Sequence, residues 1–263
     1  MTSLTDPPGR PDEGAAARVL VVTAVAAEQD AVAGAFRDTS AAPAHAPAAA
    51  RTLHRVTAGG VGVDVLAAGV GPAAAAATTA AVLAAAAQRG AGYGLVVSTG
   101  IGGGFQPGAP LCSLVVASRI VAADLGAETA EGFVPVTGLG FGTVEHRPDA
   151  ALVARVAEVT GARTGAVLTV STVTGTAARA TALRDRHPDA LAEAMEGFGV
   201  AEAAAAVGCP VVELRAVSNA VGPRDREQWR IGDALKALTD ATGRLAPVFE
   251  ALPAGARSGA VAQ

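Results

Sequence analysis

The chain has 263 residues, of which 51% are hydrophobic, 17% charged and 3% aromatic, and its formal net charge is -4. This apolar content excludes an intrinsically disordered polypeptide, because such chains bury too little apolar surface to offset the entropy of ordering. The length suits one large α/β domain or two small ones. A sequence pI of about 5.6 leaves no basic surface for phosphate backbones or anionic lipid, so we expect neither nucleic acid nor a membrane as partner.

Apolar runs and helical spacings alternate along the chain. In chain order they predict a strand at 18–25, a helix at 28–36, strands at 52–56 and 62–68 that form a hairpin around Gly59 and Gly60, a helix at 72–87, strands at 94–98 and 111–121, a helix at 149–159, a strand at 166–171, a helix at 195–207, a strand at 210–217 and a terminal helix at 232–252. Between them we expect a surface loop at 38–50, a glycine cluster at 100–104 where the backbone turns tightly or approaches a ligand closely, and an irregular segment at 123–147.

Strands that alternate with helices, without a break in composition, predict a single α/β domain from residue 18 to 253. Its expected architecture is a three-layer α/β/α fold around a central mixed, mostly parallel twisted sheet. Residues 1–17 and 254–263 are expected to be disordered tails. The tail at 1–17 lacks the apolar region of a secretory signal, and the uncharged stretch 72–87 is too short and too rich in alanine to span a bilayer. We therefore expect a cytoplasmic protein, with Cys112 and Cys209 as buried thiols in a reducing compartment.

Residues 69–74 match the pattern G-x-G-x-x-A of a dinucleotide-binding turn. The acidic partner expected about 20 residues later is missing, because no Asp or Glu occurs between Asp64 and Asp124. We interpret the motif as a tight or phosphate-binding turn and expect no cofactor. The histidines show no metal-ligand spacing, so no metal site is expected either; they are His45, His54, His146 and His187.

Polar residues stand at the ends of otherwise apolar strands, where open α/β sheets bind their ligands. They are Glu28, residues 99–104, Met195 with Glu196, and Ser218 with Asn219. Each has a structural explanation when taken alone: an acid in the first turn of a helix interacts favourably with the helix dipole, and Asn is common in turns and caps. Their order along the chain is the more informative observation.

In this order the four segments resemble the nucleoside phosphorylase/nucleosidase superfamily, and within it the hydrolytic branch of purine nucleosidases. TAVAAEQDAV is similar to the branch's A-M-x-x-E start and VVSTGIGGG to its N-T-G-x-A-G-G turn. MEGFGVA resembles its ribose motif and LRAVSN its base motif R-x-I-S-D. The resemblance covers about residues 18–252 and implies a nucleoside phosphorylase-like fold.

The resemblance also implies roles for individual residues. Glu28 would be the general base that activates water. Glu196 would accept hydrogen bonds from the ribose 2′ and 3′ hydroxyls, and Met195 would pack against the sugar. The other expected substrate-binding residues are Thr99, Gly100, Ile101, Gly175, Thr176, Ser218 and Arg224.

Asn219 is the second expected catalytic residue, and it departs from the pattern, because related adenosine-type nucleosidases carry aspartate at this position. A 6-oxopurine presents O6 and N7 as acceptors, to which the asparagine NH2 group can donate. Mispairing a buried polar group costs about 1 to 3 kcal/mol, so Asn219 should favour hypoxanthine over adenine. Asparagine has no proton to transfer, so it would stabilise the leaving anion, or Asp225 nearby would assist.

Within the branch, residues 217–231 (VSNAVGPRDREQWRI) are most similar to the futalosine hydrolase family. This likeness implies release of hypoxanthine from futalosine in the alternative menaquinone pathway. The resemblance also implies water rather than phosphate as the nucleophile: phosphorylases of the superfamily carry glycine and arginine after the first strand to bind phosphate, whereas this chain has TAVAAE there and no further arginine until Arg37. For the aromatic acid on the substrate's 5′ arm, the candidate cations are Arg224, Arg226 and His146, and the candidate stacking partners are Phe133, Phe141 and Trp229.

Three other functions remain open from the sequence. One is a methylthioadenosine, adenosylhomocysteine or aminofutalosine nucleosidase, which Asn219 disfavours. The second is a purine nucleoside phosphorylase. The third is a non-catalytic nucleoside-binding protein with the same fold. Such a protein would need only Glu196, so the presence of Glu28 as well disfavours it. The family resemblance further implies a homo-oligomer, a dimer or tetramer, in which segment 133–141 of a neighbouring subunit closes the site.

Overall fold

A single mixed sheet organises the computed structural model, which describes residues 18–36, 39–43 and 52–253. The predicted tails lie outside these residues. The strands are β1 (Arg18–Thr23), β2 (Thr39–Pro43), β3 (Thr52–Ala58), β4 (Val61–Ala67), β5 (Leu95–Gly104), β6 (Leu114–Ala122), β7 (Gly126–Thr129), β8 (Gly132–Pro135), β9 (Glu145–His146), β10 (Arg163–Thr169), β11 (Ala190–Ala194) and β12 (Val211–Ala220). The helices are α1 (Ala26–Ala33), α2 (Pro72–Gln88), α3 (Ala150–Thr160), α4 (Ala177–Arg186), α5 (Gly197–Ala205), α6 (Ile231–Gly243) and α7 (Ala246–Glu250), with a 3-10 turn η1 (Arg226–Gln228).

The strand order of the large sheet is β11-β10-β6-β12-β5-β1-β4-β3-β2. Its centre is parallel, since β5 pairs in parallel with both β1 and β12, as expected from the sequence. One pairing was not expected from the sequence: β11 also pairs with β5, in antiparallel orientation. This pairing closes β5, β12, β6, β10 and β11 into a ring, so that β11 lies beside the carboxyl end of β5.

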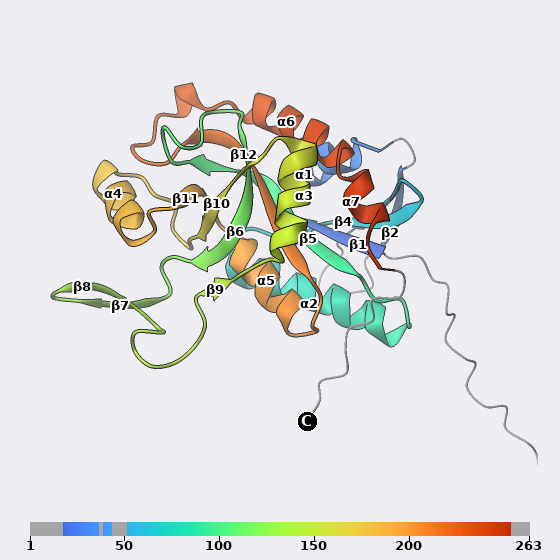
Figure 1. The fold of residues 1–263 in the computed structure, drawn as a ribbon, viewed down its shortest axis with the longest axis horizontal. Coiled ribbons are helices and arrows are strands. Elements are labelled where there is room, and N and C mark those ends of the chain that lie inside the picture. Colours follow the sequence, from blue (N-terminus) through green and yellow to red (C-terminus); the bar gives the residue numbers. More distant parts are fainter. Residues whose placement is uncertain (1–17, 37–38, 44–51, 254–263) are drawn as a thin grey trace, which may run out of the picture.

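Alternating side chains of the central strands fill two separate cores. Val19 and Val21 of β1 belong to the core beneath α1, α3, α6 and α7. Leu20 and Val22 point the other way, into the core beneath α2 and α5. Figure 1 shows these two groups of helices on opposite faces of the sheet. The predicted three-layer arrangement is confirmed, and the central strands β1, β5 and β12 are buried on both faces along most of their length.

Small residues allow α2 and α5 to approach each other closely. A Cβ atom at Gly199 of α5 would lie 2.1 Å from the Pro72 carbonyl oxygen at the start of α2. The alanines of both helices, including Ala75, Ala203 and Ala204, form the contact core. The alanine runs therefore serve close helix packing, which holds the amino ends of both helices next to the carboxyl ends of the strands.

Of the two expectations for the glycine cluster at 100–104, the tight turn is wrong, because these residues continue β5 to Gly104. Backbone pairing with β12 on one side and β11 on the other sustains the strand despite its low propensity. The glycines are needed for close approach: a Cβ at Gly102 would lie 2.7 Å from the Glu193 carbonyl oxygen.

Several other elements differ from expectation. The loop predicted at 38–50 contains the edge strand β2, paired only with β3, and residues 44–51 lie outside the described residues. The irregular segment 123–147 contains the hairpin β7–β8 and the short strand β9. The helix predicted from 195 begins at Gly197, after β11, and α4 was not predicted. The terminal helix is broken between Gly243 and Ala246, because Pro247 has no N–H to donate back to Gly243.

Both cysteines are free thiols, Cys209 buried and Cys112 only half-buried. Among the described residues, no helix is long and apolar enough to cross a membrane.

Candidate active site

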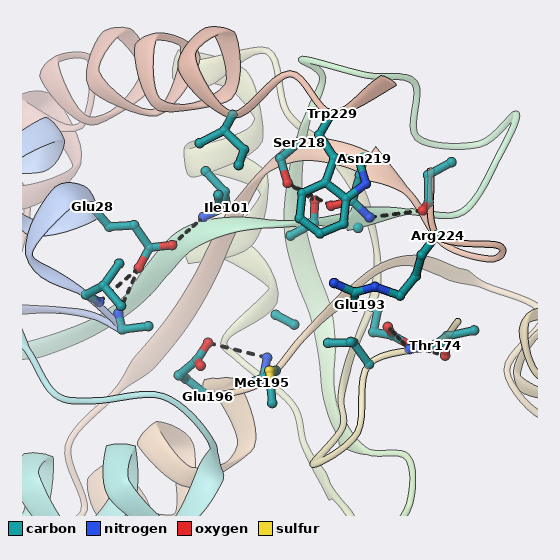
Figure 2. Close-up of a pocket in the computed structure, with 18 of the residues that line it drawn as sticks. Glu28, Ile101, Thr174, Glu193, Met195, Glu196, Ser218, Asn219, Arg224 and Trp229 are labelled. Carbon is teal, nitrogen blue, oxygen red and sulfur yellow. Dashed lines mark hydrogen bonds between the residues drawn. The ribbon is translucent and has the colours of Figure 1, made fainter. Parts of the chain in front are cut away.

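A cavity of about 230 Å³ opens where several strands end. Its walls come from the carboxyl ends of β5, β11 and β12 and from the segments that follow β1, β10, β11 and β12 (Figure 2). Seven of the predicted residues line it together: Glu28, Ile101, Met195, Glu196, Ser218, Asn219 and Arg224. The predicted convergence of polar strand ends is therefore observed.

Glu28 in the first turn of α1 is held by backbone N–H groups from two segments. Its Oε2 accepts from Ala24 N at 2.9 Å and Val25 N at 3.3 Å. Its Oε1 accepts from Ile101 N of β5 at 2.9 Å, and the residue is only 4% exposed. Gly100 makes room for it, because a Cβ there would lie 2.5 Å from Oε1. The carboxylate is thus fixed at the cavity wall with lone pairs left to accept a proton from water.

Glu196, at the start of α5, belongs to a buried ion group beneath the cavity. Its Oε2 lies 3.5 Å from Arg215 Nη1, and the Nε of Arg215 donates to Glu213 Oε1 at 2.8 Å. Arg215 is 1% exposed and Glu213 is 0% exposed. Desolvation would lower the pKa of Arg215, but the surrounding carboxylates outweigh it and raise that pKa. Desolvation raises the pKa of Glu213. Arg215 therefore stays charged and anchors Glu196 from below.

The glycine motif at 69–74 supports the same carboxylate. Gly69 and Gly71 have φ of 105° and 90°, a backbone conformation that favours glycine. The Gly71 N–H donates to Glu196 Oε1 at 3.1 Å, and Pro72 begins α2 in the next position. The motif is a tight turn, as interpreted from the sequence, and its amide holds the carboxylate expected to bind ribose.

Asn219 lies at the end of β12, on the other side of β5 from β1. Its Nδ2 donates to the Ala220 carbonyl oxygen at 3.0 Å, and its Oδ1 accepts from Ser218 Oγ at 2.9 Å. A carbonyl oxygen can only accept, so these contacts fix which end of the amide is NH2. The second hydrogen of Nδ2 is left to donate to a ligand.

Glu193 of β11 also lines the cavity, and the sequence analysis missed it. It is 5% exposed, and Thr174 donates to it twice, through its N–H to Oε1 and its hydroxyl to Oε2. Desolvation raises its pKa, against the effect of these hydrogen bonds. The sequence feature that could have identified Glu193 is that it is the one acidic residue in the apolar segment 190–195. That segment resembles the start of an alanine-rich helix rather than a strand.

Four predicted binding residues do not line the cavity. Thr99 faces the sheet interior and donates to the Leu214 carbonyl oxygen at 2.7 Å, and Gly100 lies behind Glu28. In the segment after β10, Val173 and Thr174 line the cavity instead of Gly175 and Thr176. The reason is that the Thr176 side chain caps α4, where it accepts from Arg179 N at 3.2 Å.

Of the candidates for the 5′ arm, Arg224 and Trp229 line the cavity. The Arg224 guanidinium lies 5.1 Å from the centre of the Trp229 ring. The other candidates do not line the cavity. Arg226 stacks on the Trp229 ring, and His146 forms a hydrogen bond with Glu202. Phe133 packs under the guanidinium of Arg186, and Phe141 is exposed. Asp225 caps η1 rather than lining the cavity, so the structure does not place it where it could assist Asn219.

Three comparisons show which known proteins the chain is similar to. Residues 18–252 match the family described as the phosphorylase superfamily. The chain is 68% identical over 235 residues to the futalosine hydrolase of Streptomyces coelicolor, covering 88% of this chain and 96% of that one. It is 46% identical over 234 residues to the futalosine hydrolase of Acidothermus cellulolyticus, covering 86% and 89%. The native structure of futalosine hydrolase from Helicobacter pylori matches the fold with a TM-score of 0.74 at 16% identity, covering 88% of this chain and 98% of that one.

Proposed function

Because the chain belongs to the futalosine hydrolase family of the phosphorylase superfamily, we propose that it hydrolyses the N-ribosidic bond of futalosine. The products are hypoxanthine and dehypoxanthine futalosine, and the step belongs to the alternative menaquinone pathway. The observation that carries this proposal is the placement of Glu28 and Asn219 on opposite sides of one cavity, with Met195 and Glu196 between them in the view of Figure 2.

This placement suits displacement of a purine by water. The nucleophile must approach C1′ from the face opposite the leaving base. With ribose over Met195 and Glu196, a water bound by Glu28 faces C1′ from one side, and the purine extends towards Asn219 on the other. Glu28 takes one proton of the water as the C–O bond forms and the bond from C1′ to the base breaks. Asn219 donates a hydrogen bond to O6 or N7 as negative charge develops on the purine, and the departing anion takes a proton from solvent to give hypoxanthine.

The charge of the cavity suits the sugar in the transition state. Breaking the bond to the base develops positive charge on the ribose ring. Glu28 and Glu196 both line the cavity, and preorganised carboxylates beside the sugar stabilise such charge strongly. The Glu196 carboxylate also has the acceptor lone pairs that the 2′ and 3′ hydroxyls require.

Water is favoured over phosphate by the contacts at the start of α1. The backbone N–H groups of Ala24 and Val25, which a phosphate would need, already donate to Glu28. In the described part of the chain, the cation in the cavity lining is Arg224, which lies away from Glu28 in Figure 2. A phosphate ion would therefore meet the Glu28 carboxylate without a compensating cation.

The location of Arg224 and Trp229 suggests how the 5′ arm is bound. The proposed substrate carries an aromatic acid on this arm, and the indole ring offers a stacking surface while the guanidinium offers a partner for the carboxylate. We further propose that the protein is a cytoplasmic homo-oligomer, in which a second copy completes the wall of the cavity near the 5′ arm.

The test is an assay of released base with futalosine, aminofutalosine, methylthioadenosine and inosine, each with and without phosphate. The proposal expects hypoxanthine from futalosine at a rate that phosphate does not change. Release of adenine in preference to hypoxanthine, or a requirement for phosphate, would contradict it.

A further inference from the structure

Glu193 is a buried carboxylate in the cavity that the proposed reaction does not yet use. It is 5% exposed, yet it belongs to the cavity lining. Burying a carboxylate is costly unless it is hydrogen-bonded, and the bonds from Thr174 leave lone pairs on both of its oxygens unoccupied. Such a group is well placed to accept a hydrogen bond from a ligand.

The strand register places Glu193 and Asn219 on either side of one glycine. Glu193 of β11 pairs with Gly103 of β5, and Gly103 pairs in turn with Asn219 of β12. Residues in register on neighbouring strands point to the same face of a sheet. The two side chains therefore rise from the same face, with a glycine floor between them.

The spacing of the two strands that carry these side chains suits a flat ring between them. Two interstrand spacings of about 4.8 Å each put the backbones of β11 and β12 about 9.6 Å apart. This backbone separation has room for one ring edge with a hydrogen bond of about 2.9 Å on each side. A side chain at Gly103 would contact Asn219 Nδ2 at 3.3 Å, so the glycine keeps the floor open.

From this arrangement we infer that Glu193 determines base specificity by accepting a hydrogen bond from N1–H of a 6-oxopurine while Asn219 donates to O6 or N7. The inference rests on the proposed function and deepens it, because it defines how the base is selected. Hypoxanthine carries a hydrogen on N1, whereas adenine presents a lone pair there, which a carboxylate repels. When Asn219 donates to O6, the two side chains read adjacent groups of the same ring edge and reject a 6-aminopurine at two positions.

Thr174 holds Glu193 in the acceptor role. Both donors of Thr174 point at the Glu193 carboxylate: the N–H donates to Oε1 at 2.8 Å, and the hydroxyl donates to Oε2. Two donors aimed at the two oxygens favour the deprotonated form. Thr174 is therefore a positioning residue, and Figure 2 shows it beside Glu193 on the same side of the cavity as Asn219.

The test measures binding of free bases by isothermal titration to the full chain, native and Glu193→Gln. In the variant, the Thr174 N–H donates to the side-chain oxygen of the new glutamine, so the NH2 group of that side chain faces the cavity and can donate to N1 of adenine. We expect the ratio of hypoxanthine to adenine affinity to fall at least ten-fold. Glu202→Gln, which changes an acid with 47% side-chain exposure on α5, is the matched control and should keep the native ratio.

A ratio in Glu193→Gln within two-fold of the native value would overturn the inference. Should that variant not fold, 1-methylhypoxanthine decides the question on the native chain. It lacks the N1 hydrogen and should bind at least ten-fold more weakly than hypoxanthine; equal binding would also overturn the inference. Because these readouts are binding constants, they remain decisive if futalosine is not hydrolysed, and failure of the proposed reaction is seen separately in the assay of released base.

Discussion

The two sides of the cavity are built in different ways. On the Glu28 side, the carboxylates are fixed by distant parts of the chain: Glu28 by the backbone of β5, and Glu196 by Gly71 and Arg215. On the Asn219 side, each polar side chain is hydrogen-bonded either to residues next to it in the chain or to a single other residue. Asn219 bonds Ser218 and Ala220, and Glu193 bonds Thr174.

This difference separates reaction from recognition. A group that holds water must keep its position relative to the sugar, and anchoring by the sheet and the buried ion group provides that rigidity. A group that reads the base needs only the correct donor or acceptor, and local contacts allow one side chain to change without disturbing the rest. Substitutions on the Glu28 side should therefore reduce turnover or stability, whereas those on the Asn219 side should change substrate preference.

The largest effect is expected at Glu28. Glu28→Gln removes the general base, so turnover of futalosine should fall about 1,000-fold, within the range of about 10² to 10⁴ typical of such groups. Binding should persist, because the substrate contacts of Glu196 and Asn219 remain. Single-turnover kinetics together with isothermal titration separate the two quantities, and full activity would mean that water is activated elsewhere.

The next largest effect concerns the buried ion group. Arg215→Met leaves Glu213 and Glu196 as buried carboxylates without their cation, a change that typically costs about 3 to 5 kcal/mol. Urea unfolding monitored by circular dichroism measures this loss of unfolding free energy. Lys236→Met serves as control, because it removes an exposed ion pair with Asp240 and should change stability by less than about 1 kcal/mol. Equal effects of the two substitutions would show that Arg215 is not an anchor.

A smaller effect, and of a different kind, is expected at Asn219. Asn219→Asp replaces a donor by an acceptor, so the ratio of kcat/KM for futalosine to that for aminofutalosine should fall about ten- to 100-fold, equivalent to about 1 to 3 kcal/mol. Stability should change little. An unchanged ratio would contradict the assignment of Asn219 to the base.

The smallest effect is expected at Trp229. Trp229→Leu removes the stacking surface but keeps an apolar side chain, so the KM for futalosine should rise about three- to ten-fold, corresponding to about 0.5 to 1.5 kcal/mol of aromatic contact. The kcat should remain near its native value, and inosine, which lacks the aromatic arm, should be unaffected. An equal rise in KM for inosine would place Trp229 at the nucleoside rather than at the arm.

The sequence indicated polar residues on both sides of the cavity wherever they interrupt strongly apolar segments. Glu28, Met195 with Glu196, and Asn219 all follow or precede a run whose burial is evident from composition. Glu193 could not be found in this way, since β11 consists mainly of alanine, which favours helix over strand. Its pairing with β5 is a tertiary contact that overrides local preference.

The extension of β5 was missed for a similar reason. Five consecutive residues at 100–104 include four glycines, which predict a turn by propensity. The structure uses them because Glu28, Arg215 and the backbone of β11 approach this strand more closely than a Cβ atom would allow. Local sequence therefore indicated which residues carry polar chemistry, whereas close contacts between distant segments decided where the backbone runs.

The most direct test of this account is a crystal structure of Glu28→Gln with intact futalosine bound. The account predicts the purine between Asn219 and Glu193, with Asn219 Nδ2 within hydrogen-bond distance of O6 or N7 and the ribose hydroxyls on Glu196. A water between residue 28 and C1′ should lie on the face opposite the purine. A purine bound on the side of residue 28 would contradict the account.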